Sequence, residues 1–188
     1  MALARGFMAE AGRLAAQVRA ELGLTPTDPL DPWALAEHLD VPVVPLSIYR
    51  ERAPGAFSLL LGPEQSAFSG LVATVGRRRV IVHNDSHART RQRANIGHEI
   101  AHILLFHEGK TLEHQWHLSY DADQEDEAKW LGGVLLVTDE ACLASCRAGA
   151  SITHAAAELG VSVDLVRWRR STSGAMRRVQ RERARRAA

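Results

Sequence analysis

Residues 95–107, NIGHEIAHILLFH, constrain the fold of this chain more than any other stretch. The spacing of Ile100, Ile103 and Leu104 surrounds a helix with apolar side chains on most of its faces, which predicts burial in a core. The same helix carries two histidines and a glutamate in the pattern HExxH. Unpaired imidazole and carboxylate groups are costly to bury, so this polar face must look into a cleft or find partners.

The two histidines of the motif, His98 and His102, share one face of the helix. At about 100° per residue, His102 lies about 40° from His98, and Glu99 lies about 100° away, flanking the pair. Imidazoles on adjacent turns can bind one metal ion, and the flanking glutamate can reach a water molecule beside it. We predict metal ligands at His98 and His102 and a catalytic residue at Glu99. The alternative is a packed helix whose histidines are satisfied within the core.

A third histidine follows the motif, but helix geometry argues against it as a ligand. The pattern HExxHxxGxxH is absent, because Leu105 stands where the glycine belongs and Glu108 where the last histidine belongs. On a continued helix, His107 lies about 140° from His102 and about 180° from His98. We therefore expect His107 to be structural or at the surface.

A glutamate from a following helix is the other common third ligand. Glu125 and Glu127 both lie in QEDEAKWLGGVLLV, a strong helix candidate, and are about 200° apart, so only one can face the histidines. The face of Glu125 also carries Ala128 and Gly132, whose small size would let this helix approach another closely. Geometry favours Glu125 as the ligand and leaves Glu127 as a supporting carboxylate, without excluding the reverse.

The remaining chain reads as a mixture of helices and a few strands. Gly23 should end a first helix at 7–22, and Asp31 caps a short helix through 33–39. Asp85 or Ser86 should lie near the start of the motif helix. Thr138, Ser151 and Ser162 cap three later helices. Extended segments are expected at 41–46, 56–61, 67–74 and 78–83. The predicted class is α+β, with a small, mainly antiparallel sheet of three or four strands on the motif helix and a helical C-terminal part.

The C-terminal part is strongly basic although the whole chain has a net charge of +1. From residue 167 onward there are nine arginines and one glutamate, or +8, which leaves −7 for the preceding residues. Residues 151–170 form a helix-turn-helix-like pair interrupted at Gly160, which is either scaffold or a nucleic-acid contact. The arginine-rich residues 171–188 have few apolar side chains and are expected to be flexible, with weak, non-specific nucleic-acid contact.

No apolar run is long enough to cross a membrane, and the first 20 residues lack the apolar core of a secretion signal. Cys142 and Cys146 are expected to be a reduced, partly buried pair. Without a second cysteine pair they are not predicted to be zinc ligands. These features predict a cytoplasmic protein.

The chain resembles the ImmA/IrrE family of bacterial and phage metallopeptidases in two motifs, RQRANIGHEIAHILLFH and, further on, EDEAKWLGGVLL. The N-terminal helix and residues 30–46 and 77–85 resemble it as well, so the resemblance covers about residues 8–170. Lys129, Trp130, the Gly132–Gly133 pair and the ending LLVT depart from the family pattern. The resemblance implies a zincin-like metallopeptidase domain at 1–150, followed by the helix-turn-helix-like extension at 151–170. The arginine-rich composition predicts a basic, flexible tail at 171–188.

The resemblance implies a bound Zn²⁺ held by His98, His102 and Glu125, with Glu99 as the general base. Tyr120, His117 and His114, in the link between the two motifs, are candidates to assist at the oxyanion. An extended substrate could add to a sheet edge at 66–74 or 78–83.

The family's expected substrate is a helix-turn-helix transcriptional repressor, whose cleavage would derepress stress-response or mobile-element genes. The alternative is a regulatory zinc-containing module that sequesters a repressor or binds DNA without significant proteolysis.

Overall fold

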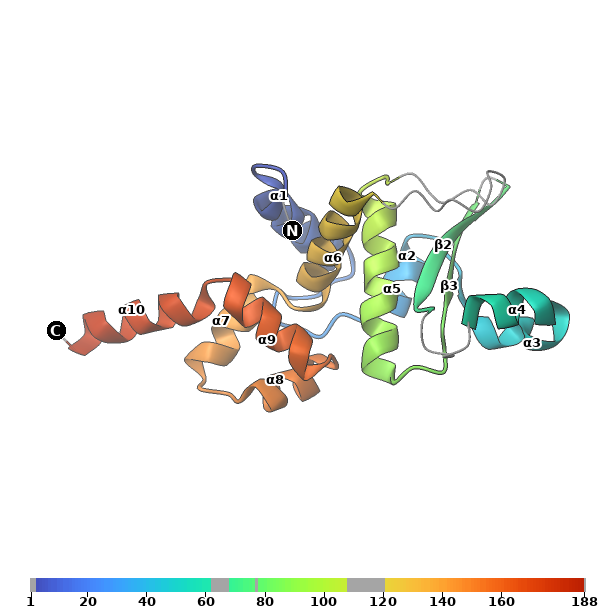
Figure 1. Cartoon of the computed structure of the whole chain (residues 1–188). Coiled ribbons are helices and arrows are strands. Elements are labelled where there is room, and N and C mark those ends of the chain that lie inside the picture. The colour runs from blue at the N-terminus through green and yellow to red at the C-terminus, as the bar shows by residue number, and fades with distance from the viewer. Residues whose placement is uncertain (1–2, 62–67, 77, 108–120, 188) are drawn as a thin grey trace. The chain divides into compact units, whose positions relative to one another are not determined.

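The computed structural model describes residues 3–61, 68–76, 78–107 and 121–187 (Figure 1). The chain divides into two compact units, one built mainly from Asp31–Gly132 and the other from Leu3–Leu30 and Gly133–Ala188. These units are defined by contacts within the chain and do not test the domain boundaries at residues 150 and 170, which stay predictions. No helix within the described ranges is long and apolar enough to cross a membrane.

The first unit contains a three-stranded mixed sheet in the order β1-β3-β2. β2 (Gly70–Val75) pairs antiparallel with β3 (Arg78–His83), with Leu71 opposite Val82, and β1 (Val43–Pro45) pairs parallel with β3. The α+β class is confirmed, but the prediction of a mainly antiparallel sheet is only half right. The short β1 is parallel to β3, and three helical segments lie between β1 and β2 in the chain.

The strand predicted at 56–61 was wrong, because these residues form most of helix α4 (Pro54–Leu61). Short helical segments η1 (Leu46–Ile48) and α3 (Tyr49–Arg52) precede it. Leucine is a strong helix former, and Pro54 is suited to the first turn of a helix. None of the residues in α4 is buried, so no tertiary packing overrides this local preference.

Helix α5 (Arg89–Leu104) carries the HExxH motif and packs against β2, β3 and α2 (Pro32–His38) (Figure 1). Asp31 caps α2 as predicted, accepting a hydrogen bond from the Trp33 amide. Asp85 and Ser86, predicted near the start of α5, precede its first residue by four and three positions and do not cap it. The Asp85 carboxylate instead accepts a hydrogen bond from the Ser47 amide, and the helix begins at Arg89 without a side-chain cap.

The second unit is helical. Thr138, Ser151 and Ser162 cap three of its helices, as predicted, by accepting hydrogen bonds from amides three residues further on. The unit comprises α1 (Phe7–Glu21), the last residues of α6 (Ala122–Leu136), α7 (Asp139–Arg147), α8 (Ile152–Leu159), α9 (Val163–Thr172) and α10 (Ala175–Ala187).

Two buried arginines bind the carbonyl groups at the end of α6, which have no partners within the helix. Arg19 donates to the Leu135 oxygen over 2.7 Å, and Arg169 donates to the Val137 oxygen over 3.0 Å. Arg169 is 1% exposed and also pairs with Asp139. Burial lowers the pKa of both guanidinium groups, and nearby carboxylates oppose that shift. The two arginines are structural cations that tie α1 and α9 to α6.

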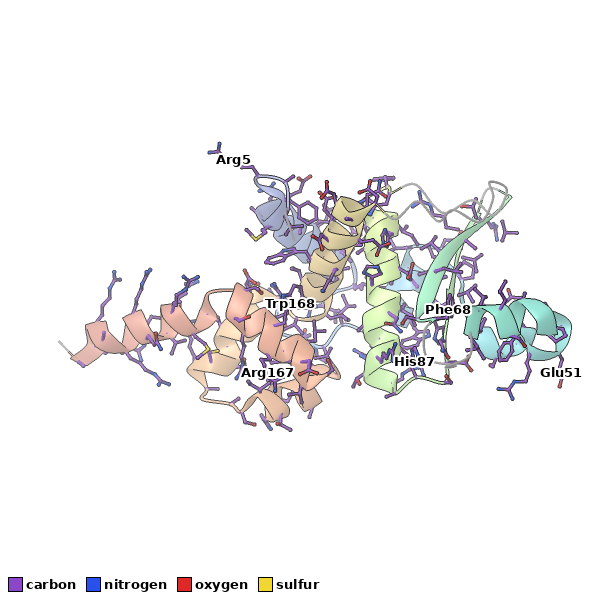
Figure 2. All side chains as sticks on the ribbon, in the orientation of Figure 1. Arg5, Glu51, Phe68, His87, Arg167 and Trp168 are labelled. Carbon is purple, nitrogen blue, oxygen red and sulfur yellow. The ribbon has the colours of Figure 1, made fainter. Side chains whose placement is uncertain are left out.

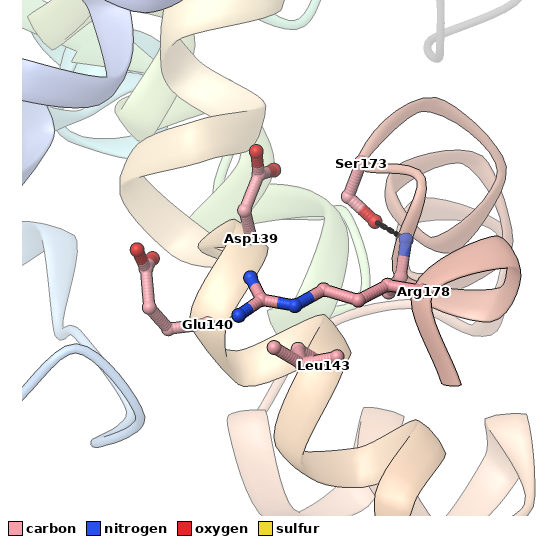
Figure 3. A pocket seen from close by; sticks show the side chains of 6 residues that line it. Asp139, Glu140, Leu143, Ser173 and Arg178 are labelled. Carbon is pink, nitrogen blue, oxygen red and sulfur yellow. Dashed lines mark hydrogen bonds between the residues drawn. The ribbon is translucent and has the colours of Figure 1, made fainter. Parts of the chain in front are cut away.

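The predicted flexible tail is instead mostly helix α10. Val179 and Ala175, four residues apart, give α10 a buried stripe, and α10 packs against α7 and α9. Arg147 of α7 donates two hydrogen bonds to the Glu182 carboxylate, at 3.0 and 2.7 Å. A hollow of about 210 Å³ remains between these segments (Figure 3), lined by Asp139, Glu140, Leu143, Ser173, Ala175 and Arg178.

Gly133 of α6 makes room for Trp168 of α9, whose position is labelled in Figure 2. A Cβ built at Gly133 would lie 2.3 Å from Cζ3 of the Trp168 ring, closer than any real contact. Gly12, in α1, has no atom within 4 Å of such a Cβ. The two glycines therefore make a matched pair of helical positions, one crowded and one open.

We expect Gly133→Ala to lower the free energy of unfolding by about 1–3 kcal/mol through overpacking. Gly12→Ala should raise it by about 0.5–1 kcal/mol, because alanine is the better helix former and meets no obstacle. Urea denaturation followed by circular dichroism measures both. Equal effects of the two substitutions would contradict the packing described for α9.

Candidate metal centre

Three side chains from two helices converge in the first unit. His98 and His102 come from α5 and Glu125 from α6, and their ligand atoms all lie within 4.8 Å of one another. Nε2 of His98 is 3.1 Å from Nε2 of His102 and 3.1 Å from Oε2 of Glu125, and the third separation is 3.7 Å. The side chains are 17–28% exposed, so the cluster is shielded but open to small molecules.

These separations fit a metal ion. Nitrogen and oxygen ligands about 2.1 Å from a tetrahedral ion lie about 3.4 Å from one another, which the three observed distances bracket. The donor set of two imidazoles and one carboxylate also suits a divalent ion that retains an open fourth position. In the part of the chain that the structure describes, this is the cluster with the composition and spacing of a metal centre.

The α5–α6 contact explains why Glu125, and not Glu127, meets the histidines. A Cβ built at Gly132 would lie 3.1 Å from the Gly97 carbonyl oxygen and 3.1 Å from the Cα of His98. Gly132 thus lets α6 approach the backbone of α5 beside the motif, as its small-residue face predicted. Glu125 lies two turns earlier on the same face, which directs its carboxylate at the histidines.

Glu99 lies on the side of α5 that faces strand β2. A Cβ built at Gly70 would lie 3.3 Å from Oε1 and 3.4 Å from Cγ of Glu99. The carboxylate therefore occupies the space that a side chain at position 70 would fill. The sequence did not mark Gly70 as part of the site, since nothing local distinguishes it from a glycine in a turn.

His107 does not lie where the helical extrapolation placed it. Helix α5 ends at Leu104, and Phe106 takes a left-handed conformation with φ of 55°. The amides of Phe106 and His107 donate to the carbonyls of Ile103 and His102, which is the Schellman pattern of a helix end. The turn brings the His107 side chain back to His102, and the residue as a whole is 9% exposed.

The structural role expected of His107 is therefore consistent with the structure, but its predicted place on the far side of the helix was wrong. A glycine after Leu105 would have signalled the helix end, and Phe106 gives no such signal. Tyr120, His117 and His114, the candidates to assist at an oxyanion, lie outside the described residues.

A protein-family model described as the IrrE N-terminal-like domain, of the Peptidase_M78 family, matches residues 36–171, well over half of the chain. The chain belongs to the IrrE N-terminal-like family. Neither curated proteins nor solved structures yield a significant match to the chain. The family assignment implies a metallopeptidase-like function and agrees with the resemblance found in the sequence.

The IrrE N-terminal-like match begins within α2 and ends within α9. It includes every residue of the three-side-chain cluster. Helices α1 and α10 lie outside the matched range, although the sequence resemblance was drawn from about residue 8. The basic helix α10 follows the matched range.

We expect Gly132→Ala to weaken binding of Zn²⁺ on the order of tenfold, because the added methyl group moves α6 and Glu125 away from the histidines. Isothermal titration with Zn²⁺ measures the affinity. Gly12→Ala, in the open position of α1, is the control and should bind like the wild type. Unchanged affinity in Gly132→Ala would show that the close helix contact does not set the geometry of the cluster.

Proposed function

We propose that the chain is a zinc-dependent endopeptidase in which His98, His102 and Glu125 bind the ion. The observation that carries the proposal is the convergence of these three ligand atoms, with Glu99 next to His98 in the motif. A bound Zn²⁺ would supply a Lewis acid that lowers the pKa of a water molecule and polarises the scissile carbonyl.

Glu99 is the group that moves protons in this proposal. Its carboxylate accepts a proton from the attacking water and delivers it to the nitrogen of the leaving amine. The absence of a side chain at Gly70 leaves room for this carboxylate to take and release a proton beside the sheet. The partial exposure of the three ligand side chains gives a peptide access to the same place.

Strand β2 is the proposed edge for substrate binding. Among the described strands, β2 pairs only with β3 and so lies at one end of the sheet order. An extended peptide could add to this edge through main-chain hydrogen bonds, next to Gly70 and Glu99. Of the two edges considered from the sequence, β3 is excluded because it is the central strand.

The proposed substrate is a specific helix-turn-helix transcriptional repressor, whose cleavage would derepress stress-response or mobile-element genes in the cytoplasm. Family membership and the clustered ligands support this proposal. A protein that sequesters the repressor without cleaving it is the alternative. A helix-turn-helix repressor encoded beside the gene for this chain would be the first substrate to test.

We expect Glu99→Gln to bind Zn²⁺ like the wild type but to cleave the repressor at least about 100-fold more slowly, because the proton acceptor is lost. Gel electrophoresis of the repressor with time, with and without a chelator, measures cleavage. Glu10→Gln, at an exposed position of α1, should cleave normally. Cleavage by Glu99→Gln at the wild-type rate would refute the mechanism, and repressor binding without any cleavage would favour sequestration.

Weak, non-specific nucleic-acid contact is a second proposed property, supported by helix α10. The helix carries six arginines against one glutamate, and its arginines are exposed. Figure 2 shows long side chains projecting from α10 in several directions. By contrast, Arg169 and Arg170 are buried, so they are not available to phosphates. The buried pair weakens the case for α9 as a recognition helix and moves the proposed contact to α10.

We expect a variant with glutamine at positions 181, 183, 185 and 186 to lose retardation of duplex DNA in low-salt gels, because phosphate contacts are electrostatic. The same four positions changed to lysine form the matched control, which keeps the charge and should keep binding. Wild-type affinity should fall steeply as salt rises. No retardation of DNA by the wild type at low salt would remove this property from the proposal.

A further inference from the structure

His107 joins the candidate metal centre to a second carboxylate of α6. Its Nδ1 lies 2.9 Å from Nδ1 of His102, and its Nε2 lies 3.3 Å from Oε2 of Glu127. His102 directs its other nitrogen, Nε2, at His98 and Glu125. A continuous chain of hydrogen-bonding groups therefore runs from the ligand cluster through two imidazoles to Glu127.

Only one placement of protons satisfies this chain when His102 binds a metal. Ligation through Nε2 needs a lone pair there, so neutral His102 must carry its proton on Nδ1. That N–H then donates to Nδ1 of His107, which must be unprotonated. His107 in turn carries its proton on Nε2 and donates it to the carboxylate of Glu127.

Burial of His107 protects these hydrogen bonds from competition by water. The His107 side chain is 7% exposed, so water competes little for its nitrogens, whereas Glu127 is 25% exposed and remains accessible to solvent as a carboxylate. The Schellman turn holds the backbone of His107 against His102 through the hydrogen bond between the His107 amide and the His102 carbonyl, at 3.0 Å. Both the backbone and the side chain of His107 are thus fixed to the same ligand residue.

The two glutamates of α6 consequently have different partners. Glu125 faces the histidine cluster, and Glu127 faces His107. A partner that accepts the second N–H of a ligating histidine fixes its tautomer and ring orientation, and loss of such a partner commonly weakens metal binding 10–100-fold.

We propose that His107 and Glu127 are positioning residues that hold His102 as its Nδ1–H tautomer, with Nε2 aimed at the metal. The inference rests on the proposed function in taking the cluster as a zinc site, but it concerns the affinity and geometry of that site, not the cleavage step. In this proposal, His107 and Glu127 act through His102 and are not themselves ligands of the ion.

Zinc affinity of the full-length protein, measured by competition with a chromogenic chelator, tests the proposal. We expect His107→Leu to bind Zn²⁺ about tenfold or more weakly, since leucine cannot accept the His102 proton. His107→Asn places an amide oxygen near the former Nδ1 and should recover much of the affinity. Glu127→Ala removes the terminal acceptor from a helix position that tolerates alanine, and should lose several-fold.

A second histidine–glutamate pair provides the matched control. His154 and Glu158 on α8 make a similar imidazole–carboxylate contact, Nε2 to Oε1 at 3.3 Å, but both side chains are more than 60% exposed. His154→Leu and Glu158→Ala should bind Zn²⁺ like the wild type. Wild-type affinity in Glu127→Ala, whether or not His107→Leu folds, would overturn the proposal.

Nitrogen NMR of the imidazoles gives a readout that a purely structural role would not move. In the zinc-free protein, long-range ¹H–¹⁵N correlations should show His102 as the Nδ1–H tautomer, and as a mixture in Glu127→Ala. An Nε2–H tautomer of His102 in the wild type would overturn the proposal. A wild type that binds no Zn²⁺ would instead refute the proposed function, so the two failures are distinguishable.

Discussion

The close contact of α5 and α6 at Gly132 is the constraint on which the metal centre depends. Imidazoles one turn apart can form two sides of a site on any helix, but the third side must come from another element. Gly132 lets the backbone of α6 approach to within van der Waals contact of His98. The close approach places a carboxylate where it offsets the cost of holding two imidazoles in a partly buried position. Gly132 therefore sets both the packing of α6 on α5 and the position of the third ligand.

Local signals in the sequence predicted much of this arrangement. The caps Asp31, Thr138, Ser151 and Ser162 mark their helices because a side-chain oxygen and an amide three residues on, or two in the case of Asp31, suffice to define them. The spacing of the HExxH motif and the small-residue face of α6 also depend only on helical period.

The features that the sequence did not predict depend on distant partners or on an unmarked helix end. α10 is stabilised by the burial of Val179 in the second unit and by the ion pair between Glu182 and Arg147. Neither contact can be recognised in the sequence, because residues 175–187 contain no apolar run. The position of His107 depends on a left-handed residue that is not glycine. Gly70 matters only because Glu99 lies across from it. Such relations appear only when the chain is folded.

Because of the turn at Phe106, the geometry of the site depends on the number of residues between His102 and the turn, as well as on which residues they are. A helix that continued past Leu104 would carry His107 away from His102 by more than a third of a turn. The left-handed residue reverses that rotation only when it lies a fixed number of residues after His102. The spacing between His102 and the turn therefore sets whether His107 reaches His102. Among related chains, insertions or deletions between the second motif histidine and the turn should therefore be tolerated less well than substitutions there.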